Sequence, residues 1–425
     1  MNLIALYAIY QQHPVVITDT RKIIAGCIFV ALKGPNFNGN RYAIEALEKG
    51  AAYCICDEWI EEKNDRVILV ENSLETLQQL ALHHRKQFNV PFIAITGSNG
   101  KTTTKELVSA VLSTNYKTYT TVGNLNNHIG VPLTLLSIGN DAEMVVIEMG
   151  ANHQKEIESY CRYTLPTHGV ITNCGKAHLE GFGGVEGVRK GKGELFDYLR
   201  ANNCTVFINN DLDYLNRMSE GIQKVIAYGT TSGFVTGNIV QDQHYLCVRM
   251  GAAVNLPKVQ TQLVGGYNLP NLLAAACIGK YFKVSDENIK EALESYYPSN
   301  SRSQLIQKGS NQIVLDAYNA NPTSMKVAII NFANMEGDKK ILMLGGMMEL
   351  GADSMQEHLE IVQLIDCYSW YKVLLVGKDY TQLPEAYLHF SGANEAREWF
   401  IQSNPTDAQI LIKGSRSMQM EKIIE

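Results

Sequence analysis

Short apolar runs alternate with longer amphipathic stretches along most of this chain. In the middle of the sequence the runs that predict strands are 92–96, 118–122, 144–148, 169–173 and 205–209. Between 101 and 113, Leu107, Val108, Val111 and Leu112 recur at helical spacing. Strands and helices that alternate in this way are typical of a doubly wound, mostly parallel sheet.

The same alternation returns near the C-terminus, with predicted strands at 312–316, 340–344, 373–376 and 410–413. Before residue 88 the pattern is shorter, with strands at 15–17 and 27–31 and helices at 42–49 and 73–88. The stretch 218–264 reads as a β-rich excursion. We therefore expect an α/β protein of three domains: a small N-terminal α/β domain (1–87), a central doubly wound domain (88–300) and a C-terminal Rossmann-like domain (301–425).

Length and composition narrow the classes of protein to which this chain can belong. The 425 residues are too many for one core, and 45% hydrophobic with 19% charged residues is ordinary for a globular protein. The net charge is −6 without a basic cluster, which argues against nucleic-acid binding. No apolar run approaches the roughly 20 residues of a membrane span. The apolar N-terminus has neither the basic flank nor the cleavage site of a signal peptide, so we expect its first ten residues to pack as a helix. We therefore expect a cytoplasmic protein. The nine scattered cysteines read as free thiols.

The segment Thr-Gly-Ser-Asn-Gly-Lys-Thr-Thr-Thr at 96–104 lies between a predicted strand and a predicted helix. In that context a glycine-rich turn and the positive helix end cradle phosphates. Lys101 would reach the terminal phosphates and Thr102 would bind magnesium, while the loop atoms come from Gly97, Ser98, Asn99, Gly100 and Thr103. The first glycine stands three residues before the second, closer than in the usual G-x-x-x-x-G-K-[ST] loop, and this indicates a narrower group of enzymes than GTPases and motor ATPases. The alternative is a turn that binds nothing.

Four further groups follow predicted strands, where α/β sheets bind their ligands. Glu148 ends an apolar run and could complete a magnesium shell, or could be an ordinary strand-end carboxylate. His178 and Lys192 taken singly read as a capping histidine and a solvated lysine. The stretch 123–136, with Asn126 and Asn127, supplies turn-forming donors and acceptors, or is simply a polar loop.

Together these motifs resemble the Mur ligase family, which joins amino acids or peptides to the cell-wall precursor with ATP. The matching stretches span nearly the whole chain: 18–21, 29–34, 96–104, 148–150, 178–180, 266–271, 301–304, 316–322, 344–351 and 413–416. Two departures stand out. The chain has Asn38-Gly39-Asn40 where the family commonly shows Asp-Gly-His, and Ser303 follows Arg302 where we expected glycine.

The resemblance implies a role for each matching residue. Lys101, His178, Lys192 and Arg302 would be catalytic, with Lys101 on the β- and γ-phosphates and Arg302 on the γ-phosphate. Thr102 and Glu148 would hold one magnesium ion, His178 would help hold a second, and Lys192 would be carbamylated into a carboxylate-like ligand. The remaining implied contacts are nucleotide contacts at Asn268, Asn271, Asp316 and Asn319, and substrate contacts at Thr18, Asp19, Thr20, Arg21, Lys33, Asn126, Asn127, Lys413 and Ser415.

The stretches 123–136 and 318–322 are characteristic of the branch that adds D-alanyl-D-alanine. The resemblance thus implies that ATP drives amide formation between UDP-N-acetylmuramoyl-tripeptide and D-alanyl-D-alanine through an acyl phosphate, in cytoplasmic peptidoglycan precursor synthesis by a monomer. A folylpolyglutamate synthase is the alternative, but it would not need the motifs at 18–33. A P-loop ATPase acting as a conformational switch would leave His178 and Lys192 unexplained.

Overall fold

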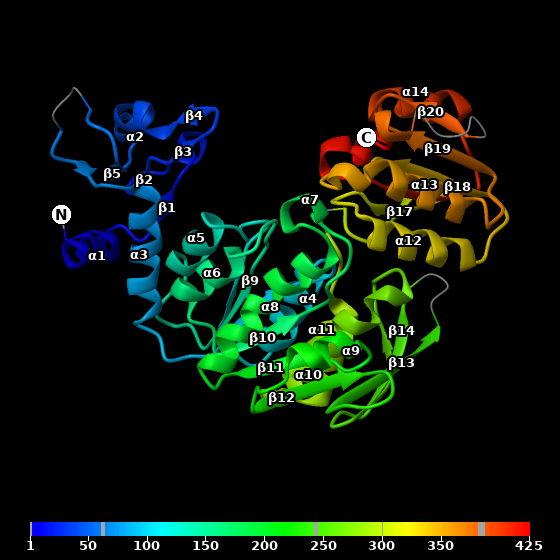
Figure 1. Ribbon diagram of the computed structural model, residues 1–425, viewed down its shortest axis with the longest axis horizontal. Helices are drawn as coiled ribbons and strands as arrows, with labels where there is room; N and C mark the ends of the chain where they lie inside the picture. The colour runs from blue at the N-terminus through cyan, green and yellow to red at the C-terminus, as the bar shows by residue number, and fades with distance from the viewer. Residues whose placement is uncertain (1, 61–63, 242–244, 300, 381–386) are drawn as a thin grey trace. The chain divides into compact units, whose positions relative to one another are not determined.

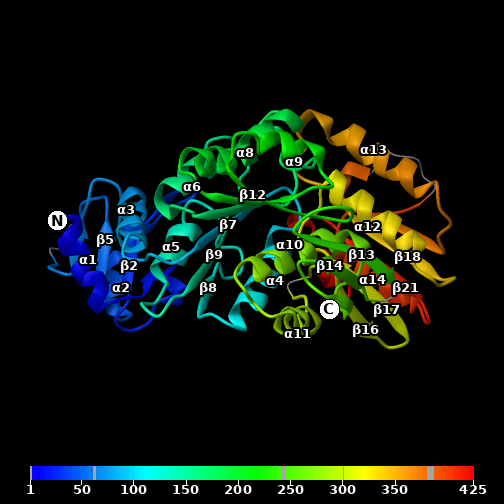
Figure 2. The same ribbon diagram turned by 90° about the horizontal axis from the view of Figure 1, so that it is seen from below.

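The computed structural model describes residues 2–60, 64–241, 245–299, 301–380 and 387–425, with the side chain of residue 241 left out. By its internal contacts the chain divides into two compact units. The first unit comprises Met1–Ile95, Tyr116–Ala151 and Lys155–Gly169, and the second comprises Thr96–Asn115, Asn152–Gln154 and Val170–Glu425. Each unit is described on its own below, with labels as in Figures 1 and 2.

The first unit begins with a small sheet in the order β1-β2-β5-β6, all parallel (Figure 1, blue). Its central strands β2 and β5 are almost wholly buried, and Phe29, Cys54 and Cys56 are completely or almost completely buried in its core. The free thiols here are packed as small apolar groups. The elements are β1 (Val16–Ile17), η1 (Thr20–Lys22), β2 (Ile28–Val30), the antiparallel pair β3 (Lys33–Gly34) and β4 (Phe37–Asn38), η2 (Gly39–Tyr42), α2 (Ala43–Glu48), β5 (Tyr53–Cys56) and β6 (Val67–Leu69).

Side-chain hydrogen bonds hold both ends of helix α3. The Asn72 side chain caps its N-terminus, and near its C-terminus Arg85 donates to the carbonyl oxygens of Thr164 and Leu165 at 2.7 and 2.9 Å. A parallel sheet in the order β7-β9-β8 follows. The elements are α1 (Leu3–Gln12), α3 (Ser73–Arg85), β7 (Phe92–Thr96), β8 (Thr118–Thr120), α5 (Gly130–Leu136), β9 (Met144–Glu148), α6 (Glu156–Thr164) and β10 (His168–Ile171), of which β7 and β10 cross from one unit into the other along the chain.

In the second unit, helix α10 lies almost wholly buried against α4 and the strands β11, β12 and β13. The strand order is β11-β12-β13-β14-β15, parallel up to β13 and antiparallel beyond it. The elements are α4 (Lys101–Ser113), α7 (Leu179–Phe182), α8 (Val185–Ala201), β11 (Thr205–Asn209), α9 (Asp213–Met218), β12 (Lys224–Gly229), β13 (Val235–Gln241), β14 (Cys247–Ala252), β15 (Leu256–Gln260), η3 (Gly266–Asn268), α10 (Leu269–Tyr281) and α11 (Asp286–Ser295).

The second unit ends in a six-stranded sheet with the order β16-β17-β21-β18-β19-β20, in which only β16 is antiparallel to its neighbour. Alternate strand residues such as Ile313, Met343 and Ile412 pack with α14 and η7 in one buried cluster. The elements are β16 (Gln304–Lys308), β17 (Asn311–Asp316), α12 (Pro322–Asn334), β18 (Lys340–Gly345), η4 (Gly351–Asp353), α13 (Ser354–Ile365), β19 (Lys372–Val376), η5 (Lys378–Tyr380), β20 (Leu388–Phe390), α14 (Ala393–Ser403), β21 (Gln409–Lys413), η6 (Arg416–Met418) and η7 (Met420–Ile423).

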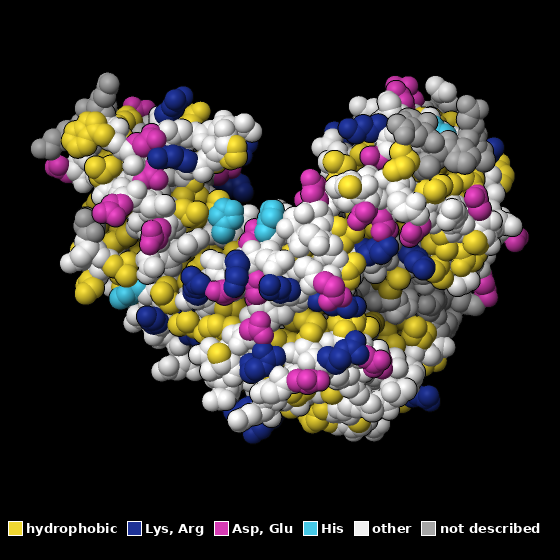
Figure 3. All heavy atoms as spheres, viewed as in Figure 1, with side chains coloured by type: hydrophobic (Ala, Val, Ile, Leu, Met, Phe, Trp, Pro, Cys, Tyr) yellow, Lys and Arg dark blue, Asp and Glu magenta, His cyan; other side chains and the backbone are white. Residues whose placement is uncertain are grey.

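The predicted α/β class is confirmed, and so is the β-rich excursion, which contains β12 to β15. Helix α4 has the predicted bounds, whereas β8 and β10 end two residues earlier than the apolar runs suggested. Among the described residues, no helix is both long and apolar enough to cross a membrane. On the face seen in Figure 3, Lys and Arg side chains are interspersed with Asp and Glu, in keeping with the lack of a basic cluster in the sequence.

Candidate functional site

The loop between β7 and α4 can be built only from glycine at two positions. Gly97 has φ of 146°, and a Cβ there would lie 2.0 Å from Thr172 Oγ1. Gly100, with φ of 78°, immediately precedes α4, and its Cβ would lie 2.6 Å from Asn271 Oδ1. The left-handed backbone and the close neighbours both exclude a side chain. At these two positions the loop therefore presents backbone without a side chain, just ahead of a 13-residue helix.

The segment after β10 supports this loop from behind. Ser98 N donates to Asn173 O at 2.9 Å, Ser98 Oγ donates to Gly175 O at 3.0 Å, and Asn99 N donates to Asn173 Oδ1 at 3.1 Å. Lys101 Nζ donates to the carbonyl oxygens of Gly97 and Ser98 at 2.7 and 3.1 Å. A glycine-built turn with a lysine folded onto it, followed by the N-terminus of a helix, is the kind of backbone arrangement that suits an anion. Thr102, which is buried, and Thr103 lie in the first turn of that helix.

Asn268 and Asn271 lie beside the same loop. Thr104 Oγ1 donates to Asn271 Oδ1 at 3.1 Å, Asn271 Nδ2 donates to Asn268 Oδ1 at 2.9 Å, and Asn268 Nδ2 donates to Val264 O at 2.9 Å. Both asparagines are buried. These bonds hold the start of α10 against α4, next to Gly100.

Arg302 lies just before β16, with its guanidinium stacked on Tyr318. The distance from Arg302 Cζ to the ring centre is 3.6 Å, which is a cation–π contact. In the part of the chain that the structure describes, its Nη1 is buried and has no hydrogen-bond partner. A buried guanidinium N–H without an acceptor is costly. An anionic ligand would satisfy it, so this residue fits the phosphate role that the sequence suggested.

Asp316, Asn319, Lys413 and Ser415 lie together at the ends of β17 and β21. The ammonium of Lys413 is almost completely buried and donates to Asp316 Oδ2 at 2.6 Å and to Asn319 O at 3.3 Å. Ser415 Oγ accepts from Met348 N at 2.9 Å. In this structure Lys413 and Ser415 therefore order the loops around them, with their polar atoms engaged by protein partners.

His178 and Lys192 occupy different surroundings. His178, in a left-handed conformation with φ of 52°, precedes α7, and its Nδ1 is in hydrogen-bond contact with Glu349 Oε2. The hydrogen bond from His178 lowers the pKa of the Glu349 carboxyl. Lys192 on α8 is 1% exposed, and its Nζ lies 4.9 Å from the Phe182 ring centre. Keeping an ammonium in such a place costs solvation free energy.

In the first unit, Glu148 ends β9 and is 1% exposed. Its backbone N–H donates to Thr121 Oγ1 at 3.0 Å, and its Oε1 accepts from Asn126 Nδ2 at 2.8 Å. Asn127 Oδ1 accepts from the backbone N–H groups of Ile129 and Gly130, which begins α5. Asn126 thus orients the carboxylate, whereas Asn127 shapes the loop.

The N-terminal candidates form two ion-paired groups. Arg21 pairs with Asp19 at 2.8 Å, and its hydrogen bonds hold the pKa of Asp19 at about 2. Thr18 and Thr20 flank Asp19 in the chain, and Thr20 begins the turn η1. Lys33 lies 3.0 Å from Glu58 and 3.2 Å from Asp57, and these partners raise the pKa of its ammonium.

Asn38 and Asn40, the residues that depart from the family motif, contact the same two carboxylates. Asn38 Nδ2 donates to Glu58 Oε2 at 2.7 Å, and Asn40 Nδ2 donates to Asp57 Oδ1 at 2.8 Å. Because each amide donates to a carboxylate, the substitution of Asp and His by asparagine keeps this turn hydrogen-bonded.

Sequence reasoning missed the contacts that join the 173–178 segment and the loop at 97–100 to α12 and α13. Asn321 Nδ2 donates to Asn99 Oδ1 at 2.7 Å, and Lys176 N donates to Thr323 Oγ1 at 3.0 Å. Lys176 Nζ forms an ion pair with Glu357 at 2.6 Å, which raises the pKa of Lys176. The partners lie 147 to 222 residues apart, and no local pattern marks them.

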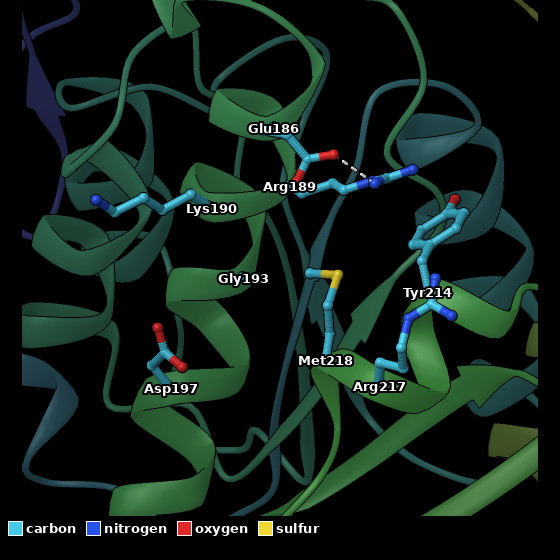
Figure 4. A pocket seen from close by; sticks show the side chains of 8 residues that line it. All are labelled: Glu186, Arg189, Lys190, Gly193, Asp197, Tyr214, Arg217 and Met218. Carbon is cyan, nitrogen blue, oxygen red and sulfur yellow. Dashed lines mark hydrogen bonds and ion pairs between the residues drawn. The ribbon is translucent and has the colours of Figure 1, made fainter.

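A cavity of about 430 Å³ lies beside α8 and α9 (Figure 4). The Arg189 side chain points toward Tyr214, and that of Lys190 extends to the other side. The lining residues are Glu186, Arg189, Lys190, Gly193, Asp197, Tyr214, Arg217 and Met218. None of the predicted site residues lines this cavity, so it carries no part of the candidate chemistry.

Comparison with known proteins gives a consistent result. The Mur ligase middle domain matches residues 95–279, and the Mur ligase glutamate ligase domain matches 301–416. The UDP-N-acetylmuramoyl-tripeptide–D-alanyl-D-alanine ligase of Escherichia coli K12 is 35% identical over 96% of this chain and 92% of its own length. The Bacillus subtilis 168 enzyme of the same name is 33% identical over 98% of this chain and 94% of its own.

Among solved structures, MurF ligase from Thermotoga maritima in complex with ADP superposes with a TM-score of 0.86. It is 26% identical, and the match covers 97% of this chain and 96% of that one. Sequence motifs, fold and full-length relatives therefore agree. The chain belongs to the Mur ligase family, in the branch of the UDP-N-acetylmuramoyl-tripeptide–D-alanyl-D-alanine ligases.

Proposed function

We propose that this protein joins D-alanyl-D-alanine to UDP-N-acetylmuramoyl-tripeptide with ATP, acting as a cytoplasmic monomer in peptidoglycan precursor synthesis. The observation that carries the proposal is the glycine-built loop at the start of α4, where Gly97 and Gly100 leave no room for a side chain. Relatives matched over 94% and 92% of their own length bear the name of this activity. The MurF ligase from Thermotoga maritima binds ADP.

The residues present suit ATP. The loop at 97–100 and the first turn of α4 would bind its phosphates, with Lys101 turning from the loop carbonyl oxygens to the β- and γ-phosphates. Arg302 would bind the γ-phosphate through the N–H that has no acceptor among the described residues. Asn268, Asn271, Asp316 and Asn319 would line the rest of the nucleotide.

Two magnesium ions belong to the same proposal. Thr102 and Glu148 would hold one, and His178 and a carbamylated Lys192 would help hold the other. Glu148 fits because one of its carboxylate oxygens is oriented by Asn126. Lys192 fits because carbamylation replaces a buried ammonium by an anion with oxygen ligands. When bound, the ions would offset the charge of the phosphates.

The reaction then needs two anions to approach each other. The terminal carboxylate of the tripeptide attacks the γ-phosphorus of ATP, giving an acyl phosphate and ADP. The amine of D-alanyl-D-alanine attacks the acyl carbon, the amide forms with loss of a proton, and phosphate leaves. Lys101 and Arg302 reduce the repulsion between carboxylate and triphosphate and stabilise charge on the transferring group.

Substrate binding is assigned to both ends of the chain. Thr18, Asp19, Thr20, Arg21 and Lys33 would bind the uridine nucleotide, and Asn126, Asn127, Lys413 and Ser415 would contact the peptide substrates. The three domains 1–87, 88–300 and 301–425 would divide the work between them. The contacts of Asn99 with Asn321 and of Lys176 with Glu357 support closure of the third domain on the nucleotide.

The test is phosphate release from ATP by the purified protein, with and without each of the two peptide substrates. Release that requires both, with a pentapeptide product detected by mass, is the expected result. Release that ignores the dipeptide would replace the proposal by an ATPase or by a ligase for another amine. Release only with folate and glutamate would select the folylpolyglutamate alternative.

A further inference from the structure

Arg302 is held between two serines in an unusual backbone conformation. Ser301 has φ of 55° and Ser303 has φ of 49°. L-residues rarely adopt this left-handed region, so surrounding contacts must hold it. The expected residue after Arg302 was glycine, which adopts this conformation freely, yet the chain has a serine that is 7% exposed.

Ser303 makes two hydrogen bonds that a glycine could not both make. Its backbone N–H donates to Asp316 Oδ1 at 3.2 Å, which any residue could do. Its side-chain Oγ, however, lies 2.9 Å from the hydroxyl oxygen of Tyr267. The Tyr267 ring is itself fixed, because it packs so closely on Gly265 that a Cβ there would lie 2.3 Å from the ring.

The Ser303–Tyr267 pair connects two groups of proposed nucleotide contacts. On one side Tyr267 immediately precedes Asn268, which accepts from Asn271 beside the phosphate loop. On the other side Asp316 accepts from Ser303 N and from Lys413 Nζ. Arg302 immediately precedes Ser303 in the chain. Its guanidinium direction is therefore set by the Ser303 backbone together with the Tyr318 ring on which it stacks.

We propose that Ser303 and Tyr267 are positioning residues that aim the Arg302 guanidinium at the γ-phosphate of ATP. The inference rests on the proposed function in one respect, namely that Arg302 contacts this phosphate. It goes beyond it by assigning the serine–tyrosine hydrogen bond as the device that fixes Arg302 in this chain. Neither residue touches the nucleotide itself in this account.

A positioning role and a purely structural role differ in what they do to two nucleotides. Misplacing Arg302 weakens binding of a triphosphate, which has a γ-phosphate, and leaves a diphosphate unaffected. Loosening the fold around η3 weakens both, because Asn268 and Asn271 serve both. The Ser303→Gly variant separates the effect of backbone strain from the effect of the lost hydrogen bond, because glycine suits the positive φ but has no hydroxyl.

The experiment measures calorimetric affinities of a non-hydrolysable ATP analogue and of ADP for the full-length protein. The variants are Ser303→Ala, Tyr267→Phe, the double variant, Ser303→Gly and Arg302→Ala. Tyr297→Phe is the matched control, since Tyr297 is 53% exposed and its hydroxyl, within the described part of the chain, makes one long bond, 3.4 Å, to Leu305 O. Thermal unfolding of each variant is recorded to verify that it folds.

We expect Ser303→Ala, Tyr267→Phe and Ser303→Gly each to lose about tenfold in analogue affinity, with ADP affinity unchanged within about twofold. The double variant should lose no more than either single variant, because both remove one bond. Equal losses for analogue and ADP, additive losses in the double variant, or wild-type affinity in Ser303→Gly would each overturn the inference. So would an Arg302→Ala variant with unchanged analogue affinity.

This design separates the inference from the proposed function. The binding measurements contain neither peptide substrate, so they give the same answer whether or not the protein ligates them. A protein that fails the phosphate-release assay but shows the selective loss of analogue affinity would refute the ligase proposal alone. A working ligase without that selective loss would refute only the role of the Ser303–Tyr267 pair.

Discussion

Gly100 shows how one residue sets the geometry of the phosphate loop. We predict that Gly100→Ala lowers the affinity for ATP by at least about tenfold, because the new Cβ would meet Asn271 Oδ1 at 2.6 Å in a left-handed conformation. Gly183→Ala is the matched control, since Gly183 has a similar φ of 75° but no atom of the described residues within 4 Å of its Cβ position. Calorimetric titration compares the two. Equal losses in both variants would mean that backbone strain, not the Asn271 contact, makes the glycine necessary.

The proposed carbamylation of Lys192 gives the most specific chemical prediction for a single residue. If its ammonium becomes a carbamate that holds magnesium, Lys192→Ala should lower the ligase kcat by about a hundredfold or more, and added small carboxylates should restore part of it. Lys190→Ala, an exposed lysine on the same helix, should behave like the wild-type protein. A Lys192→Ala protein that keeps full activity without added carboxylate would disprove the carbamate.

His84 gives a pH dependence of stability. It is buried, it contacts Ile138 O through Nε2 at 2.9 Å, and burial lowers its pKa below the ordinary 6.5. The unfolded chain therefore binds a proton at a higher pH than the folded one. The neutral imidazole makes its full contribution to the free energy of unfolding above about pH 6.5. This contribution is lost as the pH falls through the lower pKa of the folded state.

We predict that the free energy of unfolding, measured with urea, falls more steeply between pH 6.5 and pH 5 in the wild-type protein than in His84→Gln. His13→Gln, which changes a histidine that is only partly buried, serves as the control. The same slope in wild-type and His84→Gln proteins would show that His84 does not titrate in this range.

Site residues differ in how far the sequence reveals them. The loop 97–102 and Glu148 were predictable because each follows an apolar strand directly, and the chain itself brings them to a strand end. The roles of Ser303 and Tyr267 were not, because their hydroxyls meet across 36 residues and the relevant signal, a positive φ at Ser303, exists only in three dimensions. Lys413 was assigned to substrate from its motif, and only the structure shows that its ammonium is bonded to Asp316.

At the scale of elements, periodicity predicted most of the central and C-terminal pattern. Helix α4 was predicted with its observed bounds because its apolar residues keep one face toward α10 and the glycine before it sets its start. Strand β16 was missed since its residues are partly exposed and it is specified by antiparallel pairing with β17 rather than by its own apolar pattern. β20 was missed for the same reason, as an edge strand.

The link between the 173–178 segment and α13 supports a prediction about two elements. Lys176 pairs with Glu357, which is 6% exposed, so removal of either partner breaks the short ion pair between the two elements. We predict that Lys176→Met and Glu357→Gln each raise the KM for ATP by about three- to tenfold, and that the double variant is no worse than either. Glu360→Gln, which removes a carboxylate 3.8 Å from the same ammonium, should have little effect. Independent, multiplicative losses would contradict a direct link.

At the scale of the whole molecule, we propose that one ATP site activates a carboxylate for attack by an amine. The contacts within the second unit are consistent with this, because residues from α4, α10, β17 and β21 are joined by hydrogen bonds through Asn271, Asp316 and Ser303. The proposed magnesium ligand Glu148 and the proposed uridine contacts belong to the first unit. Length and the pattern of apolar runs predict several α/β domains. The substrate, in contrast, is indicated only by specific side chains.

The most direct test traces a carboxylate oxygen of the tripeptide substrate into the released phosphate. UDP-N-acetylmuramoyl-tripeptide labelled with ¹⁸O in its terminal carboxylate is incubated with ATP, magnesium, D-alanyl-D-alanine and the protein, and both products are analysed by mass spectrometry. The account predicts a pentapeptide product and one ¹⁸O in each phosphate released, because the carboxylate oxygen leaves with the phosphoryl group. Unlabelled phosphate, or phosphate released without pentapeptide, would contradict it.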